Sequence, residues 1–405
     1  MVFTRHLTCI RRTIACMLLG FPVMGISFTA IAQDADSMKR FSVQGYVSDL
    51  QSAIIQQVKG DWIKENTLHN RLNFFFYPSS SWKASVQLRN RLVYGDYFAN
   101  FPGYASNFSH DRGFAPLSFN LAEGNSFLLN TQADRIYAEY SKGNVDITAG
   151  RQRINWAQTL VWNPNDIFNN YSFFDFDYEE KPGADGIRIQ YFTGAESVIE
   201  LAGKVDSAGK VTTAGLFRFN HWGYDIQFFA GMLEQSDMAL GLGWSGSIGG
   251  AAFRGEAGYY RPFRHFRDTD AIFQLSLGSD YNFPNSLFLQ AEVLYSFNKR
   301  RPPVVNLLDY YSAPLSVKNL SFTDWNLFMQ TSYPITPLIN SSLAIMYFPR
   351  VSGFYAGPNF SFSVAENFSF TTLFQYFSGN IPDAAGTSTG RENFGLVYLR
   401  FKYSF

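Results

Sequence analysis

The chain has 405 residues, of which 46% are apolar, 18% are aromatic and only 16% are charged. An apolar fraction near half is ordinary for a folded chain and indicates neither disorder nor a bundle of membrane helices. Basic and acidic residues number 33 each, which disfavours a nucleic-acid-binding surface built on net positive charge. The 42 Phe and 23 Tyr, with so few charges, are also unusual for a water-soluble enzyme.

Residues 1–32 have the pattern of a secretory signal peptide. Arg5, Arg11 and Arg12 precede an apolar stretch near residues 13–28, and the small residues Ala30 and Ala32 mark a cleavage site. A retained membrane anchor is the alternative. Cleavage after residue 32 removes three arginines and no acidic residue, which leaves 30 basic and 33 acidic residues in the mature chain.

The mature chain contains no thiol, because Cys9 and Cys16 both lie in the signal peptide. Disulfides, zinc-thiolate sites and cysteine nucleophiles are therefore excluded from residues 33–405. The mature histidines are far apart and show no metal-ligand spacing, so we expect neither a metal nor a cofactor. These histidines are His69, His110, His221 and His265.

Alternation of apolar and polar residues dominates the mature chain. It is clear in residues 82–91, 134–140, 187–191, 224–228 and 287–297. Successive side chains of a strand point to opposite faces, so each segment has one continuous apolar face. A soluble sandwich shows the same pattern, but segments of about 9–12 residues with this aromatic content favour a membrane barrel whose apolar face contacts lipid.

Short and long connections alternate along the chain. Short ones rich in Gly, Pro, Ser or Asn are predicted at 78–81, 142–144, 194–196, 220–223, 246–249, 284–286, 334–337 and 365–367. Longer ones are predicted at 96–131, 154–183, 261–270, 298–322 and 379–392. Outer-membrane barrels have short periplasmic turns and longer extracellular loops.

The predicted fold is therefore all-β, a transmembrane antiparallel β-barrel of about 18 strands, with 16 as the alternative count. An even count places both chain ends on the periplasmic side. Nothing interrupts the series, so residues 33–405 are predicted to form one domain.

The last strand carries a further signal. Apolar residues occupy every second position back from the final residue, at Leu399, Phe401, Tyr403 and Phe405. This pattern resembles the C-terminal assembly signal of bacterial outer-membrane barrels. By architecture the whole mature chain resembles bacterial outer-membrane porins, which implies insertion by the barrel-assembly machinery.

A second resemblance lies in residues 150–156 and 161–168, with the sequences GRQRINW and VWNPNDIF. They look like a segment of porin and exopolysaccharide-export barrels. There the segment joins a strand to a long loop folded toward the pore, and the resemblance implies such a loop here.

Alternation also assigns a basic arc to the interior. A charged side chain on the lipid face destabilises a barrel by about 2–4 kcal/mol near the membrane midplane, so we place the charged residues of these strands inside. The predicted pore-lining residues are Arg71, Lys83, Arg89, Arg91, Arg135, Glu139 and Arg188. Further acidic interior candidates are Glu200, Asp225, Glu256, Asp280 and Glu292.

The long loop at 154–183 is the predicted constriction, because oppositely charged walls screen solutes by charge and size. Its acidic residues are Asp166, Asp175, Asp177, Glu179 and Glu180. An exposed loop that binds divalent ions or lipopolysaccharide is the alternative. The 96–131 loop could form a plug, a constriction or an external cap.

Arg151 and Arg153 share the apolar face of their strand unless Gly150 marks a bulge. A bulge would turn both arginines into the pore, and without one they sit at the outer headgroup level.

No enzymatic site is predicted. Residues 241–246 match a dinucleotide-binding pattern but lie in an alternating strand with no helix after it.

We therefore predict a bacterial outer-membrane porin that conducts small hydrophilic solutes passively, with a mild preference for anions. The expected partners are outer-membrane lipid, lipopolysaccharide and small solutes, with no nucleic acid; a homotrimer and a monomer both fit the sequence. A barrel for polysaccharide export or surface assembly is the main alternative, and an adhesin or receptor with a blocked lumen is another.

Overall fold

The computed structural model describes residues 40–56, 60, 62–101, 103–169, 173–174, 176, 180–264, 266–301, 316–382 and 388–405. The predicted signal peptide lies outside these residues. All the structural findings below concern the described part of the chain.

Nineteen strands, all paired antiparallel, make up the sheet. The first ten are β1 (Phe41–Ile55), β2 (Ile63–Ser79), β3 (Trp82–Gly95), β4 (Ser118–Glu123), β5 (Phe127–Lys142), β6 (Val145–Gln152), β7 (Ala184–Gly194), β8 (Ser197–Val205), β9 (Val211–His221) and β10 (Tyr224–Leu233). The others are β11 (Asp237–Ile248), β12 (Ala251–Pro262), β13 (Ile272–Asn282), β14 (Phe288–Phe297), β15 (Trp325–Thr336), β16 (Ile339–Phe348), β17 (Gly353–Ala365), β18 (Phe368–Pro382) and β19 (Ser388–Ser404).

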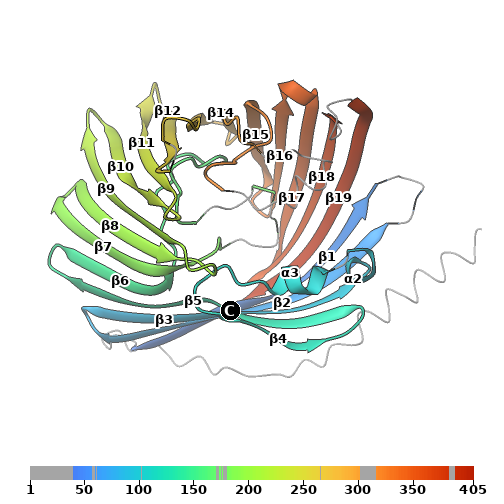
Figure 1. Cartoon of the computed structure of the whole chain (residues 1–405). Helices are drawn as coiled ribbons and strands as arrows, with labels where there is room; N and C mark the ends of the chain where they lie inside the picture. The colour runs from blue at the N-terminus through green and yellow to red at the C-terminus, as the bar shows by residue number, and fades with distance from the viewer. Residues whose placement is uncertain are drawn as a thin grey trace, which may run out of the picture. The chain divides into compact units, whose positions relative to one another are not determined.

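The sheet closes on itself, because β1 pairs with both β2 and β19 (Figure 1). At the seam, Gly45 and Phe405 exchange two backbone hydrogen bonds of 2.9 Å. The short strand β4 pairs only with β5, above the end of β6, so eighteen of the described strands form the closed wall. The predicted barrel of about 18 strands is confirmed.

Short turns join neighbouring strands of the barrel. Each of the eight predicted short connections joins two neighbouring strands in the structure. Trp222 and Gly223 have φ values of 54° and 74° in the β9–β10 turn, and Asn367 has a φ of 61° in the β17–β18 turn. Such left-handed positions are typical of tight hairpins. The longer connections gather at the other end of the barrel.

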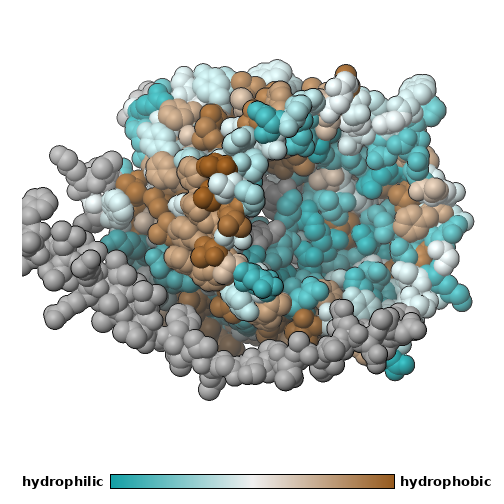
Figure 2. All heavy atoms as spheres, turned by 180° about the vertical axis from the view of Figure 1, so that it is seen from behind, coloured by the Kyte–Doolittle hydropathy of each residue, from teal (hydrophilic) through white to brown (hydrophobic). Residues whose placement is uncertain are grey.

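Along the strands, the two faces differ as the alternation predicts. On β8, Ile199 and Leu201 are 43% and 56% exposed on the outer face, whereas Glu200 and Ala202 are 4% and 6% exposed on the inner face. Hydrophilic residues line much of the hollow (Figure 2). An apolar exterior around a polar interior is the arrangement of a barrel that spans a membrane.

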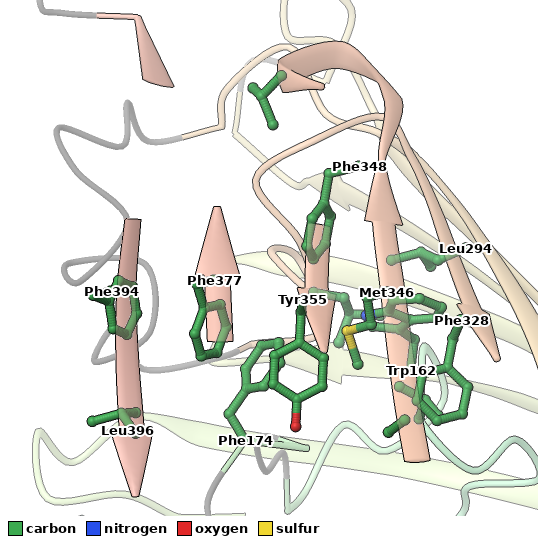
Figure 3. Packing of buried hydrophobic residues seen from close by; sticks show 14 of the residues in the cluster. Trp162, Phe174, Leu294, Phe328, Met346, Phe348, Tyr355, Phe377, Phe394 and Leu396 are labelled. Carbon is green, nitrogen blue, oxygen red and sulfur yellow. The ribbon is translucent and has the colours of Figure 1, made fainter. Parts of the chain in front are cut away.

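The inner face of β14–β19 departs from this rule. Here inward side chains are also apolar and form one buried cluster with residues of the long loop after β6 (Figure 3). The cluster includes Trp162, Phe174, Leu294, Phe328, Met346, Tyr355, Phe377 and Leu396. Where these apolar side chains lie, the inner face is packed against the loop rather than exposed to the lumen, which simple alternation did not predict.

Helical segments are short: α2 (Tyr97–Asn100), α3 (Tyr104–Ser109) and a 3-10 turn, η1 (Pro349–Val351). No described helix has both the length and the hydropathy to cross a bilayer. Phe108 of α3 lies over the Arg91 guanidinium, 3.9 Å from its ring centroid, so the segment after β3 packs over one end of the predicted basic arc.

The final strand presents the predicted assembly pattern outward. Phe401, Tyr403 and Phe405 are 39–49% exposed, whereas the intervening Lys402 is half-buried. Recognition of this pattern by the assembly machinery stays a prediction.

Candidate functional site

The inner face of β2, β3 and β5 carries most of the predicted basic arc, and we call it the basic wall. It is centred on Arg71 of β2, whose side chain is fully buried. Its Nη2 donates to Asp134 Oδ2 at 2.8 Å and to Gln87 Oε1 at 2.7 Å, and its Nε donates to Asn73 Oδ1 at 3.0 Å. Glu180 lies 3.5 Å from its Nη1. This arginine therefore joins strands β2, β3 and β5 to the end of the long loop.

Asp134 owes its inward position to a β-bulge. The β3–β5 register shifts between Gln87 and Leu88, because Gln87 pairs with Arg135 whereas Leu88 pairs with Ala133. A bulge places two residues of one strand opposite one residue of its partner. The shift therefore brings Asp134 and Arg135 to the same face. Strict alternation assigns Asp134 to the lipid face, so sequence reasoning missed this carboxylate.

Two more predicted arginines lie on β3 and are buried; Arg89 pairs across the strands with Arg71, and Arg91 pairs with His69. Arg89 is 4% exposed and donates from Nε to His69 Nε2 at 3.4 Å. Arg91 is 6% exposed and donates from Nη2 to Asn130 Oδ1 at 3.2 Å. Together with Arg71 they form a row of guanidinium groups on the inner face.

The remaining predicted charges of this wall are more accessible. Lys83 and Glu139 face each other across β3 and β5 at 3.8 Å, with both side chains 30% exposed. Arg188 is half-buried on β7. Whether these groups contact a passing solute stays a prediction.

Residues 153–183 connect β6 to β7, and we call this segment the inner loop. Its described residues, 153–169, 173–174, 176 and 180–183, fold into the barrel and contact its wall. Trp156, fully buried, donates from its indole Nε1 to Glu200 Oε1 at 2.6 Å. Its carbonyl accepts from Gln227 Nε2 at 2.6 Å, and Gln227 Oε1 accepts from Gln158 Nε2 at 2.8 Å. These contacts fix the start of the inner loop to β8 and β10.

Glu256 of β12 tethers the next part. Its carboxylate accepts hydrogen bonds from the backbone N–H groups of Gln158, Thr159 and Asn165, the last two at 2.7 and 2.8 Å. The side chain is fully buried. A carboxylate that gathers backbone donors satisfies groups that would otherwise be buried without partners.

Glu292 of β14 repeats this arrangement. It accepts from the backbone N–H groups of Leu160 and Val161, each at 3.1 Å, and of Trp162 at 2.7 Å. Ser276 Oγ adds a fourth hydrogen bond at 2.9 Å. Residues 158–165 are thus held to one wall by two glutamates that the sequence offered only as general acidic interior candidates.

The second half of the inner loop contacts the other walls. Phe173 packs against Phe328 of β15 at 5.1 Å between ring centroids, and Phe174 packs against Phe377 of β18 at 5.2 Å. Glu180 then reaches β1 and β5, where its Oε2 accepts from Tyr46 Oη at 3.3 Å and its carbonyl accepts from Arg135 Nη2 at 2.6 Å. The described residues of the inner loop therefore touch the wall around most of its circumference.

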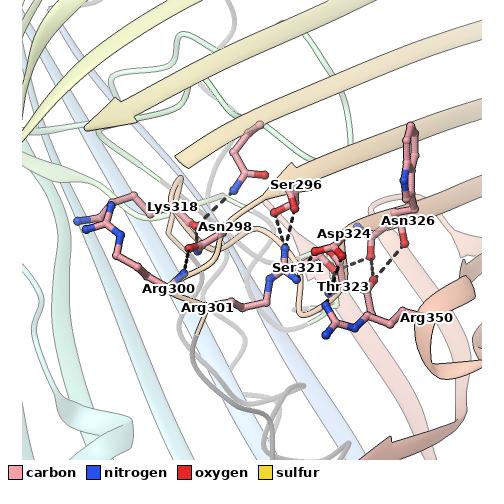
Figure 4. A network of polar contacts seen from close by, with 12 residues as sticks. Ser296, Asn298, Arg300, Arg301, Lys318, Ser321, Thr323, Asp324, Asn326 and Arg350 are labelled. Carbon is pink, nitrogen blue, oxygen red and sulfur yellow. Dashed lines mark hydrogen bonds and ion pairs between the residues drawn. The ribbon is translucent and has the colours of Figure 1, made fainter. Parts of the chain in front are cut away.

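The described residues of the β14–β15 connection form a polar network with the ends of these strands (Figure 4). Arg301 donates from Nη1 to Asp324 Oδ1 and from Nη2 to the Ser296 carbonyl, both at 2.7 Å, which closes the base of the β14–β15 loop. Lys318 Nζ donates to Asp237 Oδ2 at 2.9 Å. This loop is thereby fastened to the rim near β11.

Asp166 has an unusual environment within the inner loop. It is fully buried, and Arg153 Nη2 lies 3.6 Å from its Oδ2. Burial raises the pKa of Asp166 to about 7, although the positive charges of Arg153, Lys181 and Lys204 act against the rise. Burial likewise lowers the pKa of Lys181 to about 8.

The five acidic residues of the predicted constriction lie only partly within the described residues. Asp166 faces protein on all sides and Glu180 is tied to the basic wall, whereas Asp175, Asp177 and Glu179 lie outside the described residues. The role of these five residues at a constriction stays a prediction.

Arg151 lies on the outer face, because its pairing with Ile136 and Asp185 continues through Gly150 without a register shift. It forms ion pairs with Asp185 at 2.5 Å and with Asp111 at 2.8 Å, and donates to the Ala115 carbonyl at 2.7 Å. The segment after α3 therefore covers this arginine. Arg153, beyond the end of β6, instead contacts Asp166.

Among the described residues, no group of three or more His, Cys, Asp or Glu side chains could hold a metal ion. The arrangement tethers a loop and places charged groups on the inner face of the barrel.

No protein-family model matches the sequence. No curated protein sequence matches it either. Solved structures do share its fold. OccK9 (OpdG) of Pseudomonas aeruginosa superposes with a TM-score of 0.57 at 10% identity, over 90% of this chain and 98% of that one. OccAB4 of Acinetobacter baumannii gives 0.54 at 8% identity, over 91% and 99%.

The outer membrane protein OprD from Pseudomonas aeruginosa gives a TM-score of 0.56 at 8% identity, over 90% of this chain and 94% of that one. Identities this low establish the fold and nothing finer. The chain has the closed eighteen-stranded barrel fold of the Occ and OprD outer-membrane porins.

Proposed function

We propose that this protein is a channel of the bacterial outer membrane through which small hydrophilic solutes diffuse passively. The observation that carries the proposal is the inner loop, which Glu256 and Glu292 hold inside a closed barrel of porin fold. A loop tethered in this way narrows a lumen that eighteen strands would otherwise leave wide. The likeness to the outer membrane protein OprD supports the location.

We further propose a mild preference for anions. Arg71, Arg89 and Arg91 form a row on the inner face of β2 and β3, and Lys83 and Arg188 are more accessible on the same side. Fixed positive charge in a narrow passage raises the local concentration of anions. Asp134 and Glu139 offset part of this charge, which is why the proposed preference is mild.

Single-channel recording of the folded barrel in a planar bilayer tests both statements. Steady ohmic steps are expected, and a reversal potential in a KCl gradient should show chloride to be more permeable than potassium. Greater potassium permeability would overturn the anion preference alone. Absence of conductance from a correctly folded barrel would mean that the loops seal it, and a role in polysaccharide export or surface assembly would then be the better proposal.

The fold neighbours and the absence of a catalytic pattern in the sequence also lead us to propose that the protein is not an enzyme.

A further inference from the structure

A pocket of about 300 Å³ opens on the inner face of β15–β19, below the apolar cluster. This volume lies at the lower end of the range for small-ligand sites. The pocket lies on β15–β19, which β1 separates from the arginine row on β2 and β3, and none of the three arginines lines it, so the anion preference does not account for it.

The pocket exists because the inward side chains change from apolar to polar over two residues along these strands. Phe328 of β15 is followed two residues on by Gln330, and Phe377 of β18 is preceded two residues earlier by Gln375. On β17, Gly357 takes the equivalent place beside Tyr355. A Cβ at Gly357 would lie 2.2 Å from Tyr355 Oη, so glycine makes room for this hydroxyl. The Tyr355 oxygen points away from the apolar cluster in Figure 3.

Two inner-loop rings complete the lining, Phe173 and Phe176. Phe176 is stacked under the Arg400 guanidinium at 4.5 Å from the ring centroid and lies 5.4 Å from the Tyr398 ring. Aromatic faces offer apolar contact surface with defined geometry. The pocket thus combines flat rings with polar groups that point between them.

The polar groups are mostly neutral. Gln330, Asn359 and Gln375 supply amides and Ser342 a hydroxyl, while Arg400 alone among the described lining residues carries a charge. Amides both donate and accept hydrogen bonds, so this set matches a ligand with several hydroxyl groups better than a simple anion or cation.

Gln375 adds a further acceptor to this set. Its side chain is 2% exposed, and its Nε2 donates to the Phe174 carbonyl at 3.4 Å. Its Oε1 accepts no hydrogen bond from the described residues although it is buried. A buried acceptor without a donor is costly, and a donor from a bound ligand would remove that cost.

We propose that this pocket is a sugar-binding subsite of the channel. The aromatic faces contact the C–H surface of a sugar ring, the amides exchange hydrogen bonds with its hydroxyls, and Gln375 Oε1 accepts from one of them. Arg400 additionally favours a sugar that carries a carboxylate. The proposal rests on the proposed channel function, since a solute must reach the lumen to enter the pocket.

Isothermal titration calorimetry of the folded barrel in detergent measures the binding of small solutes and does not require a conducting channel. Glucose, glucuronate and succinate serve as probes for a neutral sugar, an acidic sugar and an acid without a ring. We expect both sugars to bind and succinate to bind at least tenfold more weakly. Binding of glucuronate without glucose would still support the subsite, with Arg400 as its main contact. Binding of succinate with neither sugar, or of no probe, would overturn it.

Gln375→Leu should weaken sugar binding about fivefold, as the loss of one hydrogen bond predicts. Gln274→Leu is the matched control. Gln274 is also a buried inward amide that donates to a loop carbonyl, here Lys318 at 3.3 Å, but it lies outside the pocket. Its replacement should leave sugar affinity unchanged. Equal effects of the two variants would overturn the assignment of the site.

Arg400→Gln should remove any advantage of glucuronate over glucose while preserving glucose binding. Conductance measured separately distinguishes the two proposals. Sugar binding by a barrel that conducts no ions would refute the channel function and leave the subsite standing. An open channel with no affinity for sugars would refute the subsite alone.

Discussion

The guanidinium of Arg71 on β2 lies 2.8 Å from the carboxylate of Asp134 on β5, and both side chains are buried, at 0% and 2% exposure. Strand β3 runs between them and contributes Gln87, which accepts a second hydrogen bond from the same Nη2. The pair depends on the bulge in β5, since only the extra residue brings Asp134 to the inner face.

Arg71→Met should destabilise the barrel by about 3 kcal/mol or more, because it leaves Asp134 as a buried charge without its principal partner. Urea unfolding of the protein in lipid vesicles measures the loss. Asp134→Leu in the same background should recover part of it, since replacing both partners of a buried ion pair costs less than removing one. Losses that simply add in the double variant would show that the two residues are not coupled.

Glu292→Gln should loosen the inner loop and increase both the single-channel conductance and its fluctuation. The amide retains one acceptor but loses the charge that strengthens the hydrogen bonds to Leu160, Val161 and Trp162. Glu139→Gln is the control, because Glu139 is also an inward glutamate but its ion pair with Lys83 is partly exposed. If both variants conduct alike, the tether does not set the width of the passage.

Docking of the inner loop should depend on pH through Asp166. Burial raises its pKa to about 7, whereas a solvated aspartate in an undocked loop has a pKa of about 4. At pH values between these two pKa values the docked loop therefore binds more protons than the undocked loop. Docking thus weakens as the pH rises from about 4 to about 7. We expect larger conductance at pH 8 than at pH 5.

Asp166→Asn removes the titrating group and should abolish this difference in conductance between pH 5 and pH 8. Persistence of the full pH effect in this variant would assign it to another group.

Lys83→Gln should lower the ratio of chloride to potassium permeability with little effect on stability. Lys83 is 30% exposed and its ion pair with Glu139 spans 3.8 Å, so the pair contributes little to folding. Reversal potentials in a KCl gradient give the ratio, and urea unfolding gives the stability. An unchanged ratio would remove Lys83 from the selective surface.

The barrel, its strand count and its short turns follow from the sequence because they depend on local patterns. Alternation and turn residues act over a few positions, and every predicted short connection is present. The inward face of β14–β19 did not follow, since its apolar residues are matched by Trp162 and Phe174 from far along the chain. Tertiary packing decided that face.

The same distinction holds for the site. The charge at Arg71 could be placed inside from parity alone, but Asp134 required a bulge that no glycine or proline marks. Glu256 and Glu292 could be assigned to the interior, yet nothing local shows that they hold backbone N–H groups 97 and 130 residues away in sequence. Such partners are set by the closed wall, which short-range patterns do not encode.

The tethers of the inner loop also imply an order of events during assembly. Residues 158–162 precede β12 and β14 in the chain, so the loop has no Glu256 or Glu292 to bind until those later strands have joined the wall. Its contact with Phe377 requires β18, near the end of the sequence. Contacts of such long sequence separation form late. The barrel is therefore expected to pass through a wide, unconstricted state, and the passage narrows only as the last strands close.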